Sequence, residues 1–238
     1  MLKLGIDVGG ASLKSALVNT KTGDFASDIY IVKAEKLSSI RFLEIVKQIV
    51  KYFDWKGEIG CGFPAVVQNG VVKTATNIGK DFIGKNLSEL IEDATNCKAT
   101  IMNDADAAAM AEFKFGKAKD FEGTKLLLTL GTGIGAAIYK TELIPNLELG
   151  QLKIKNGIVG EQYCAASIKT RENLSYEVWA KRLNEYLLEI DALINPDLII
   201  IGGGISKDYD KFEKYLDLKN KIQIATLLND TGIVGAVL

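Results

Sequence analysis

Two polar side chains lie close together in the segment PNLELGQL, residues 145–152. Glu148 offers a carboxylate and Gln151 an amide, and such groups hydrogen-bond the hydroxyls of a small polyol. The run LTLGTGIGAA lies upstream, and its glycines between positions 131 and 135 let backbone amides approach an anion closely. The two loops are either parts of one sugar-phosphorylating site or unrelated.

The letters GTGIGA, residues 131–136, also match the dinucleotide pattern GxGxxG/A. That motif requires a strand, a tight turn and then a helix whose N-terminus faces the pyrophosphate. Here the turn is followed by AAIYKTELI, which is rich in β-branched and aromatic residues and has no helix cap. The sequence therefore predicts a hairpin rather than a dinucleotide-binding unit.

A second glycine turn occurs in IDVGGASLK, where Asp7 ends a strand just before Gly9 and Gly10. Magnesium prefers carboxylate, water and phosphate oxygens, so Asp7 is a candidate to hold Mg²⁺ through one of its waters. Lys14 or the turn amides would face the phosphate. The alternatives are that Asp7 only caps the turn and that Lys14 is a solvated strand residue.

The segment NDADAAAMAEF begins where a buried strand changes into a helix. Asn103 and Asp104 therefore emerge at a strand end, where ligand sites of α/β proteins tend to lie. A carboxylate there can take the proton of an attacking hydroxyl. Asn and Asp are also ordinary helix caps, and we assign Asp106 to that structural role.

The elements around these motifs alternate between strands and helices. The pattern predicts an antiparallel three-stranded meander over residues 2–8, 12–19 and 24–34. It predicts an amphipathic helix over residues 38–53, which is capped by serine and packs through a face that includes Ile40. After Gly116 the strand, glycine turn and strand pattern restarts. The chain is thus expected to be an α/β protein with two similar halves.

Composition limits the function classes. The formal net charge of -1 gives no basic field for nucleic acid or an anionic membrane, and the apolar runs are far shorter than a membrane span. The chain starts in a strand pattern without a signal-peptide layout, so we expect a cytoplasmic protein. It contains no histidine and three widely separated cysteines, which argues against histidine-based nucleophilic catalysis and against a zinc site.

Six motifs, in order, resemble the ROK family of sugar kinases in the actin-like ATPase superfamily, and within it the polyphosphate glucokinases. They are IDVGGASLK, GFPAVVQNGVV, NDADAAAMAE, LTLGTGIGAA, PNLELGQL and LIIIGGGISK. The resemblance implies a ribonuclease H-like fold of two α/β lobes, residues 1–108 and 109–238, with a cleft between them. The last helix, about 229–238, is expected to pack back on the first lobe.

The resemblance also implies residue roles. Asp104 would be the catalytic base, and the sugar would be bound by Asn77, Asn103, Glu148, Gln151 and Glu161. The phosphoryl donor would be held by Asp7 with magnesium and by Gly9, Gly10, Lys14, Thr132, Gly133, Gly202, Gly203 and Gly204. For Glu161 a solvent-facing helix position is the alternative.

Two departures from the family pattern affect the sugar site. Gln151 stands where the family has histidine, and Ala65 stands where a glycine commonly follows Pro64. The expected activity is transfer of a phosphoryl group from polyphosphate or ATP to the 6-hydroxyl of glucose. The alternatives are a kinase for another hexose or amino sugar, and a sugar-sensing protein that has lost catalysis. A DNA-binding repressor is not expected. The repressors of this family carry a helix-turn-helix before the first glycine turn, whereas here a strand begins at residue 2.

Donor and partners follow from the same resemblance. A long polyphosphate needs a cationic track, for which the candidates are the lysines at 73, 80, 85, 114, 117 and 119. Only the family likeness favours polyphosphate over ATP. The expected ligands are a small sugar, a phosphoryl donor and Mg²⁺, and the relatives imply a homodimer.

Overall fold

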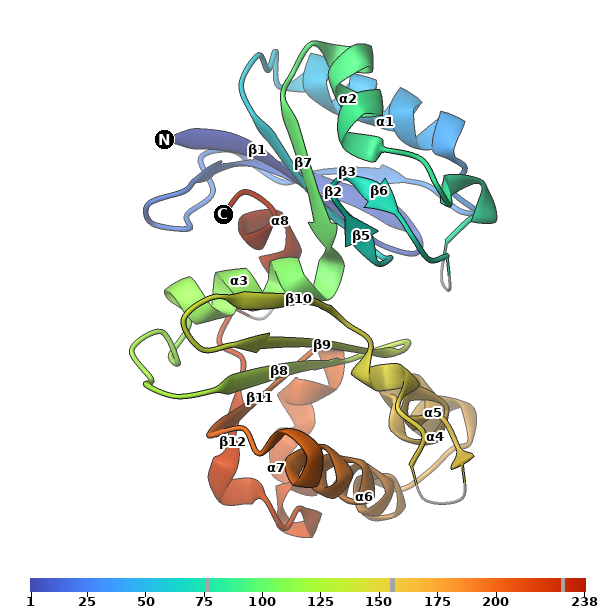
Figure 1. Ribbon diagram of the computed structural model, residues 1–238, viewed down its shortest axis with the longest axis vertical. Coiled ribbons are helices and arrows are strands. Elements are labelled where there is room, and N and C mark those ends of the chain that lie inside the picture. The colour runs from blue at the N-terminus through green and yellow to red at the C-terminus, as the bar shows by residue number, and fades with distance from the viewer. Residues whose placement is uncertain (76–77, 155–156, 228–229) are drawn as a thin grey trace. The chain divides into compact units, whose positions relative to one another are not determined.

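The protein is described by a computed structural model (Figure 1). The described residues are 1–75, 78–154, 157–227 and 230–238. The chain divides into two compact units, of which unit 1 comprises Met1–Lys119 with Asn229–Leu238 and unit 2 comprises Asp120–Leu228. Each unit has its own five-stranded sheet and its own hydrophobic core, so the expected α/β class is confirmed.

The expected boundary at residues 108 and 109 is wrong. It falls inside α3 (Asp104–Phe115), a continuous helix that packs against strands of the first unit, and the units separate only after Lys119. The helix contacts β4, β7 and α8, which all belong to unit 1, so the whole of α3 belongs to that unit. The last helix, α8 (Thr231–Gly235), belongs to unit 1 although the whole of unit 2 precedes it in the sequence.

Unit 1 is built on a mixed sheet with the strand order β3-β2-β1-β4-β7. Its strands are β1 (Leu2–Val8), β2 (Ser12–Asn19), β3 (Tyr30–Lys33), β4 (Ile59–Phe63), β5 (Val67–Gln68), β6 (Val71–Val72) and β7 (Ala99–Asn103). Its helices are α1 (Ser39–Tyr52), the single turn η1 (Lys80–Phe82), α2 (Leu87–Thr95), α3 and α8. The meander β1-β2-β3 is antiparallel as expected, although β3 is shorter than residues 24–34.

Helix α1 begins with the expected serine cap, since Ser38 Oγ accepts a hydrogen bond from the Arg41 amide at 3.2 Å. Its buried face is formed by Phe42, Ile45, Val46 and Ile49, whose spacing forms a stripe along one side of the helix. Ile40 lies off this stripe and is 72% exposed, so its predicted burial is wrong.

Helix α8 packs closely against the rest of unit 1, because the glycines at this contact have no side chains that would hold the elements apart. A Cβ at Gly235 would overlap the carbonyl oxygen of Ala107 in α3, and one at Gly5 in β1 would overlap that of Ile233. The side chains of Ile233 and Val234 in α8 are buried. This packing brings the C-terminal segment next to Asp7, which ends β1.

Unit 2 repeats the strand order of unit 1 as β10-β9-β8-β11-β12. Its strands are β8 (Lys125–Leu130), β9 (Ile134–Tyr139), β10 (Leu143–Leu147), β11 (Leu198–Gly202) and β12 (Ile222–Ile224). Its helices are α4 (Gly160–Cys164), α5 (Ala166–Arg171), α6 (Tyr176–Ile194) and α7 (Tyr209–Phe212), with single turns η2 (Leu149–Gln151), η4 (Gly204–Asp208), η5 (Glu213–Tyr215) and η6 (Lys219–Lys221). The equal strand order confirms two similar halves.

Helix α6 forms one wall of the core of unit 2. It begins at the cap Ser175 and buries Trp179, Leu183, Leu187 and Ile190, which recur at helical spacing against the sheet. Within the described ranges, no helix is both long enough and apolar enough to cross a membrane.

Candidate functional site

Two carboxylates meet at the strand ends of unit 1. Asp7 in β1 is level with Gly62 in the parallel neighbour β4, and β4 in turn pairs with β7, which leads directly into Asp104. A Cβ at Gly62 would lie 3.7 Å from both Asp7 Oδ1 and the Asp104 Cα. Gly62 therefore leaves the space beside these two acids open, and this glycine was not identified from the sequence.

Burial gives Asp104 the properties of a base near neutral pH. Its pKa is raised from 3.8 to about 6, mainly by burial and further by the charge of Asp7, against the lowering effect of a hydrogen bond from the Ala105 amide. That amide donates to Asp104 Oδ1 at 2.8 Å. A carboxylate with a pKa near 6 is ionised at pH 7 and binds a proton more strongly than an ordinary aspartate does.

Asn103 is the N-cap of α3. Its Oδ1 accepts hydrogen bonds from the amides of Ala105 at 2.8 Å and Asp106 at 3.2 Å, and its Nδ2 donates to the carbonyl of Ala65 at 3.1 Å. These bonds hold the start of α3 and the loop after β4 together. The contact of Asn103 with sugar stays a prediction.

Asp7 lies in a mixed electrostatic environment. Burial is the main cause that raises its pKa; the charge of Lys14 opposes this rise and the charge of Asp230 adds to it. Lys14 Nζ binds Asp230 Oδ1 at 2.6 Å, and a Cβ at Gly232 would lie 2.6 Å from Asp7 Oδ1. Lys14 was expected to face phosphate, and its ion pair with Asp230 was not foreseen because 216 residues separate the two.

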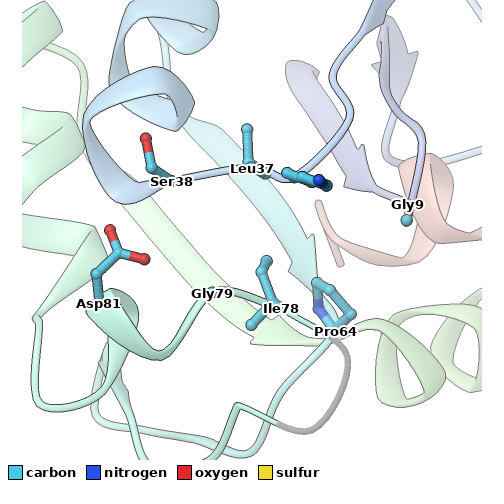
Figure 2. Close-up of a pocket in the computed structure, with 9 residues that line it drawn as sticks. Gly9, Leu37, Ser38, Pro64, Ile78, Gly79 and Asp81 are labelled. Atoms are coloured by element: carbon cyan, nitrogen blue, oxygen red, sulfur yellow. The ribbon is translucent and has the colours of Figure 1, made fainter.

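The first glycine turn borders a cavity of about 560 Å³ in unit 1 (Figure 2). Gly9, Gly10, Ser38 and Pro64 are among its lining residues. Gly9 donates its amide to the carbonyl of Ser12 at 2.9 Å, whereas a Cβ at Gly10 would meet nothing within 4 Å. The sequence identified the turn but not the cavity, whose walls come from separate loops.

In unit 2 the polar segment forms a cluster with α4. Gln151 Nε2 donates to Glu161 Oε1 at 2.7 Å. Glu148 lies just before η2, and its pKa is raised by burial and by the charge of Glu161. The structure therefore brings together these three predicted sugar-binding residues, and Glu161 is not an isolated surface position.

The glycine turn at residues 131–133 joins the antiparallel strands β8 and β9, so the predicted hairpin is confirmed and the dinucleotide-binding unit is excluded. The Gly131 amide donates to the Gly133 carbonyl at 3.0 Å, and Ser167 Oγ donates to the Thr132 carbonyl at 2.6 Å. A Cβ at Gly133 would lie 2.7 Å from Glu161 Oε2. The phosphate-type turn and the polar cluster are thus adjacent within unit 2.

The third glycine segment follows β11. Gly203 has φ 85°, and a Cβ there would overlap the carbonyl oxygen of Leu130, the residue just before the turn at 131. Gly203 therefore has to be glycine both for its backbone and for its contact. Gly202 and Gly204 flank it, and the role of the three in donor binding stays a prediction.

The predicted residues thus fall into two sets. Unit 1 brings together Asp7, Asn103 and Asp104 near the first glycine turn, and unit 2 brings together the polar cluster and the other glycine turns. Asn77 lies outside the described residues. Asp230 and Gly232, which lie near Lys14 and Asp7, were not predicted as site residues from the sequence.

Comparison with known proteins places these motifs in a family. The family model described as "ROK family" matches residues 3–144. A polyphosphate glucokinase of Mycobacterium tuberculosis (strain CDC 1551 / Oshkosh) is 39% identical over 237 residues, which cover 98% of this chain and 89% of that protein.

Solved structures agree with this similarity. The inorganic polyphosphate/ATP-glucomannokinase of Arthrobacter sp. strain KM superposes with a TM-score of 0.91 at 34% identity, covering 99% of this chain and 96% of that one. A ROK family glucokinase of Streptomyces griseus, in complex with glucose and AMPPNP, has a TM-score of 0.80 at 20% identity and supports the fold alone. With most of its length matched by the family and by a relative of this identity, the chain belongs to the ROK family.

Proposed function

We propose that this protein is a glucokinase that transfers a phosphoryl group from polyphosphate or ATP to the 6-hydroxyl of glucose. The names of its Mycobacterium and Arthrobacter relatives support the reaction type and both donors. The observation that carries the proposal is the carboxylate of Asp104, which stands at a strand end beside Asp7 with its pKa raised to about 6.

Asp104 acts as the general base. It accepts the proton of the sugar 6-hydroxyl while that oxygen bonds to the terminal phosphorus of the donor. The bond from this phosphorus to its bridging oxygen breaks, which releases ADP or a polyphosphate shorter by one unit. Phosphoryl transfer requires mainly positioning and charge stabilisation, and removal of a single general base typically lowers the rate by about 10²- to 10⁴-fold.

The acids of unit 1 fit Mg²⁺. Mg²⁺ is usually held by one or two carboxylates, with water and substrate phosphate completing its shell. Asp7 supplies such a carboxylate, while no group of three or more His, Cys, Asp or Glu suited to a metal occurs in the described part of the chain. Asp7 would hold the ion, and its burial-raised pKa indicates a carboxylate that a cation would stabilise. Bound Mg²⁺ would neutralise charge on the donor phosphates.

Unit 2 contributes binding groups for both substrates. The carboxylates of Glu148 and Glu161 accept hydrogen bonds from sugar hydroxyls, and the Gln151 amide accepts and donates them. The backbone amides of the turn at residues 131–133 bind donor phosphate. The Gln151–Glu161 hydrogen bond at 2.7 Å supports this role because it leaves the second oxygen of Glu161 for a ligand.

Asp104→Asn tests the proposal. The variant should bind glucose in calorimetry with nearly unchanged affinity, while glucose 6-phosphate formation with ATP and with polyphosphate falls by about 10²-fold or more. Asp93→Asn is the matched control, because Asp93 is an exposed acid on α2 of the same unit. Near-normal turnover of Asp104→Asn would remove the assigned base.

A second candidate is a kinase for another hexose or amino sugar. Gln151 in the polar cluster favours testing this, because its hydrogen bond to Glu161 orients a side chain that is proposed to contact the sugar. A panel of glucose, mannose and N-acetylated or amino sugars at matched donor concentration distinguishes the candidates. Sugar binding without phosphoryl transfer by the unmodified protein would instead support a sensing protein.

We also propose a cytoplasmic homodimer, which rests on the family likeness alone. Light scattering coupled to size-exclusion chromatography would measure the mass against the monomer mass of 25.9 kDa. A mass equal to one chain at working concentrations would contradict the dimer.

A further inference from the structure

One cation lines the cavity beside the first glycine turn. Lys36 is the only lysine or arginine among the residues that border this cavity of about 560 Å³ in the described part of unit 1. It is exposed, and it makes no hydrogen bond or ion pair with any described residue. Its ammonium group is therefore available to an anion.

The backbone of Lys36 is in an unfavourable region. Eight described residues other than glycine have positive φ, and Lys36, with φ 51°, is the only one of them that is not Asn or Asp. Asn and Asp tolerate this conformation through local hydrogen bonds, whereas a lysine lacks these and adopts it less often. Residues held in such conformations cluster at ligand-binding positions, so the choice of lysine here indicates a use for its side chain.

The acid that borders the cavity does not form an ion pair with Lys36. Asp81 also borders the cavity, but its Oδ2 accepts a hydrogen bond from the Ser39 amide at 2.7 Å, at the start of α1. In Figure 2 the labelled Asp81 lies on the far side of the cavity from Gly9. The amide of Gly10, next to Gly9, donates to no residue in the described ranges, and a Cβ at Gly10 would meet nothing within 4 Å.

We propose that Lys36, with the Gly10 amide, binds the part of an inorganic polyphosphate chain that is not transferred. The inference rests on the proposed function, in which the first glycine turn holds the phosphoryl donor. A polyanion continuing past this turn would enter a cavity bordered by a lysine and a backbone amide that have no partner among the described residues. ATP carries a nucleoside in place of that continuing chain, so it would not need Lys36.

Lys36 is not among the lysines that the sequence suggests for a cationic track. Two of those are engaged elsewhere, since Lys85 Nζ donates to Ser39 Oγ at 2.5 Å and Lys114 Nζ donates to the Thr20 carbonyl at 3.3 Å. The cavity thus identifies a residue that a search for basic clusters in the sequence passes over.

Lys36→Asn tests the proposal, because Asn removes the charge and accepts the left-handed backbone. We expect the KM for long-chain polyphosphate to rise about five- to tenfold, as for loss of one charge-assisted contact, and to depend less steeply on salt. The KM values for ATP and glucose should change less than about twofold, and the melting temperature should not fall. Lys33→Asn is the matched control, an exposed lysine of β3 outside the cavity.

Several results would overturn the assignment. They are an equal rise of KM for both donors, a rise for glucose instead, or an effect no larger than that of Lys33→Asn. Turnover of glucose by the unmodified protein tests the proposed function separately. If ATP is the only donor used, calorimetric binding of tripolyphosphate to the unmodified protein and to Lys36→Asn decides the inference, and equal affinities would refute it.

Discussion

The side-chain amide of Gln151 donates a hydrogen bond of 2.7 Å to Oε1 of Glu161. The other oxygen of Glu161 faces the glycine turn, because a Cβ at Gly133 would lie 2.7 Å from Oε2 and one at Gly150 would lie 3.4 Å from it. Glu161 is thus held from one side by Gln151 and confined on the other by two glycines. The orientation of the Glu161 side chain therefore depends on both the segment at residues 145–152 and the glycine turn at residues 131–133.

Gly133→Ala should weaken sugar binding without unfolding the protein. Its new Cβ meets only the end of the Glu161 side chain, which can move, and Gly133 does not have a positive φ. We expect the KM for glucose to rise about threefold to tenfold through the displaced carboxylate, with a small change in melting temperature.

Gly131→Ala is the matched control in the same turn, since a Cβ at Gly131 would meet nothing within 4 Å. Gln151→Leu should resemble Gly133→Ala because it removes the other restraint on Glu161. Equal KM values for Gly131→Ala and Gly133→Ala would show that Glu161 does not position the sugar.

Activity should rise with pH through the range in which Asp104 loses its proton. A general base works only when ionised, and the pKa of this carboxyl is raised to about 6. The profile of kcat/KM should therefore have an acid limb with its midpoint at or below about 6, since a cation bound beside Asp7 would lower it. A flat profile from pH 5 to 8 under rate-limiting chemistry would exclude Asp104 as the base.

Asp104 also lowers the stability of the fold at neutral pH. The folded state binds its proton more tightly than the unfolded state, in which the pKa is near 3.8, so stability falls as pH rises from about 4 to 6 and stays lower above that. Asp104→Asn should raise the free energy of unfolding at pH 7 by on the order of 1 kcal/mol. The gain should vanish near pH 3, and a gain that persists there would have another cause.

Gly235→Ala should loosen α8 from unit 1. A Cβ at this position would overlap the backbone carbonyl of Ala107, which cannot move aside as a side chain can. We expect a loss of about 2 kcal/mol or more and a melting temperature lower by roughly 4–8 °C. Gly10→Ala, at an open position, should change the melting temperature little.

The three thiols should be unreactive in the folded protein. Cys61, Cys97 and Cys164 are all buried, and burial raises the pKa of Cys61 and of Cys164 well above the usual range. Little thiolate is then available at pH 8. Ellman's reagent should label none of them quickly in native buffer and all three in denaturant. Rapid labelling of the native protein would contradict their burial.

Local patterns in the sequence determined much of this protein. The change from buried strand to capped helix at Asn103 and Asp104 was predictable because strand burial and helix capping depend on adjacent residues. The hairpin at residues 131–133 was predictable for the same reason, as the residues after the turn favour a strand. Ordered motifs then identified the family.

Contacts between distant segments were decided only by the tertiary structure. Lys14 and Asp230 pair across 216 residues, and the space beside Gly133 is bounded by Glu161 of α4, 28 residues further along the chain. The place of Lys36 in a cavity and the exposure of Ile40 likewise depend on which elements pack together. Periodicity shows which residues share a face of one element, but the partner of that face is set by long-range packing, which leaves no local pattern in the chain.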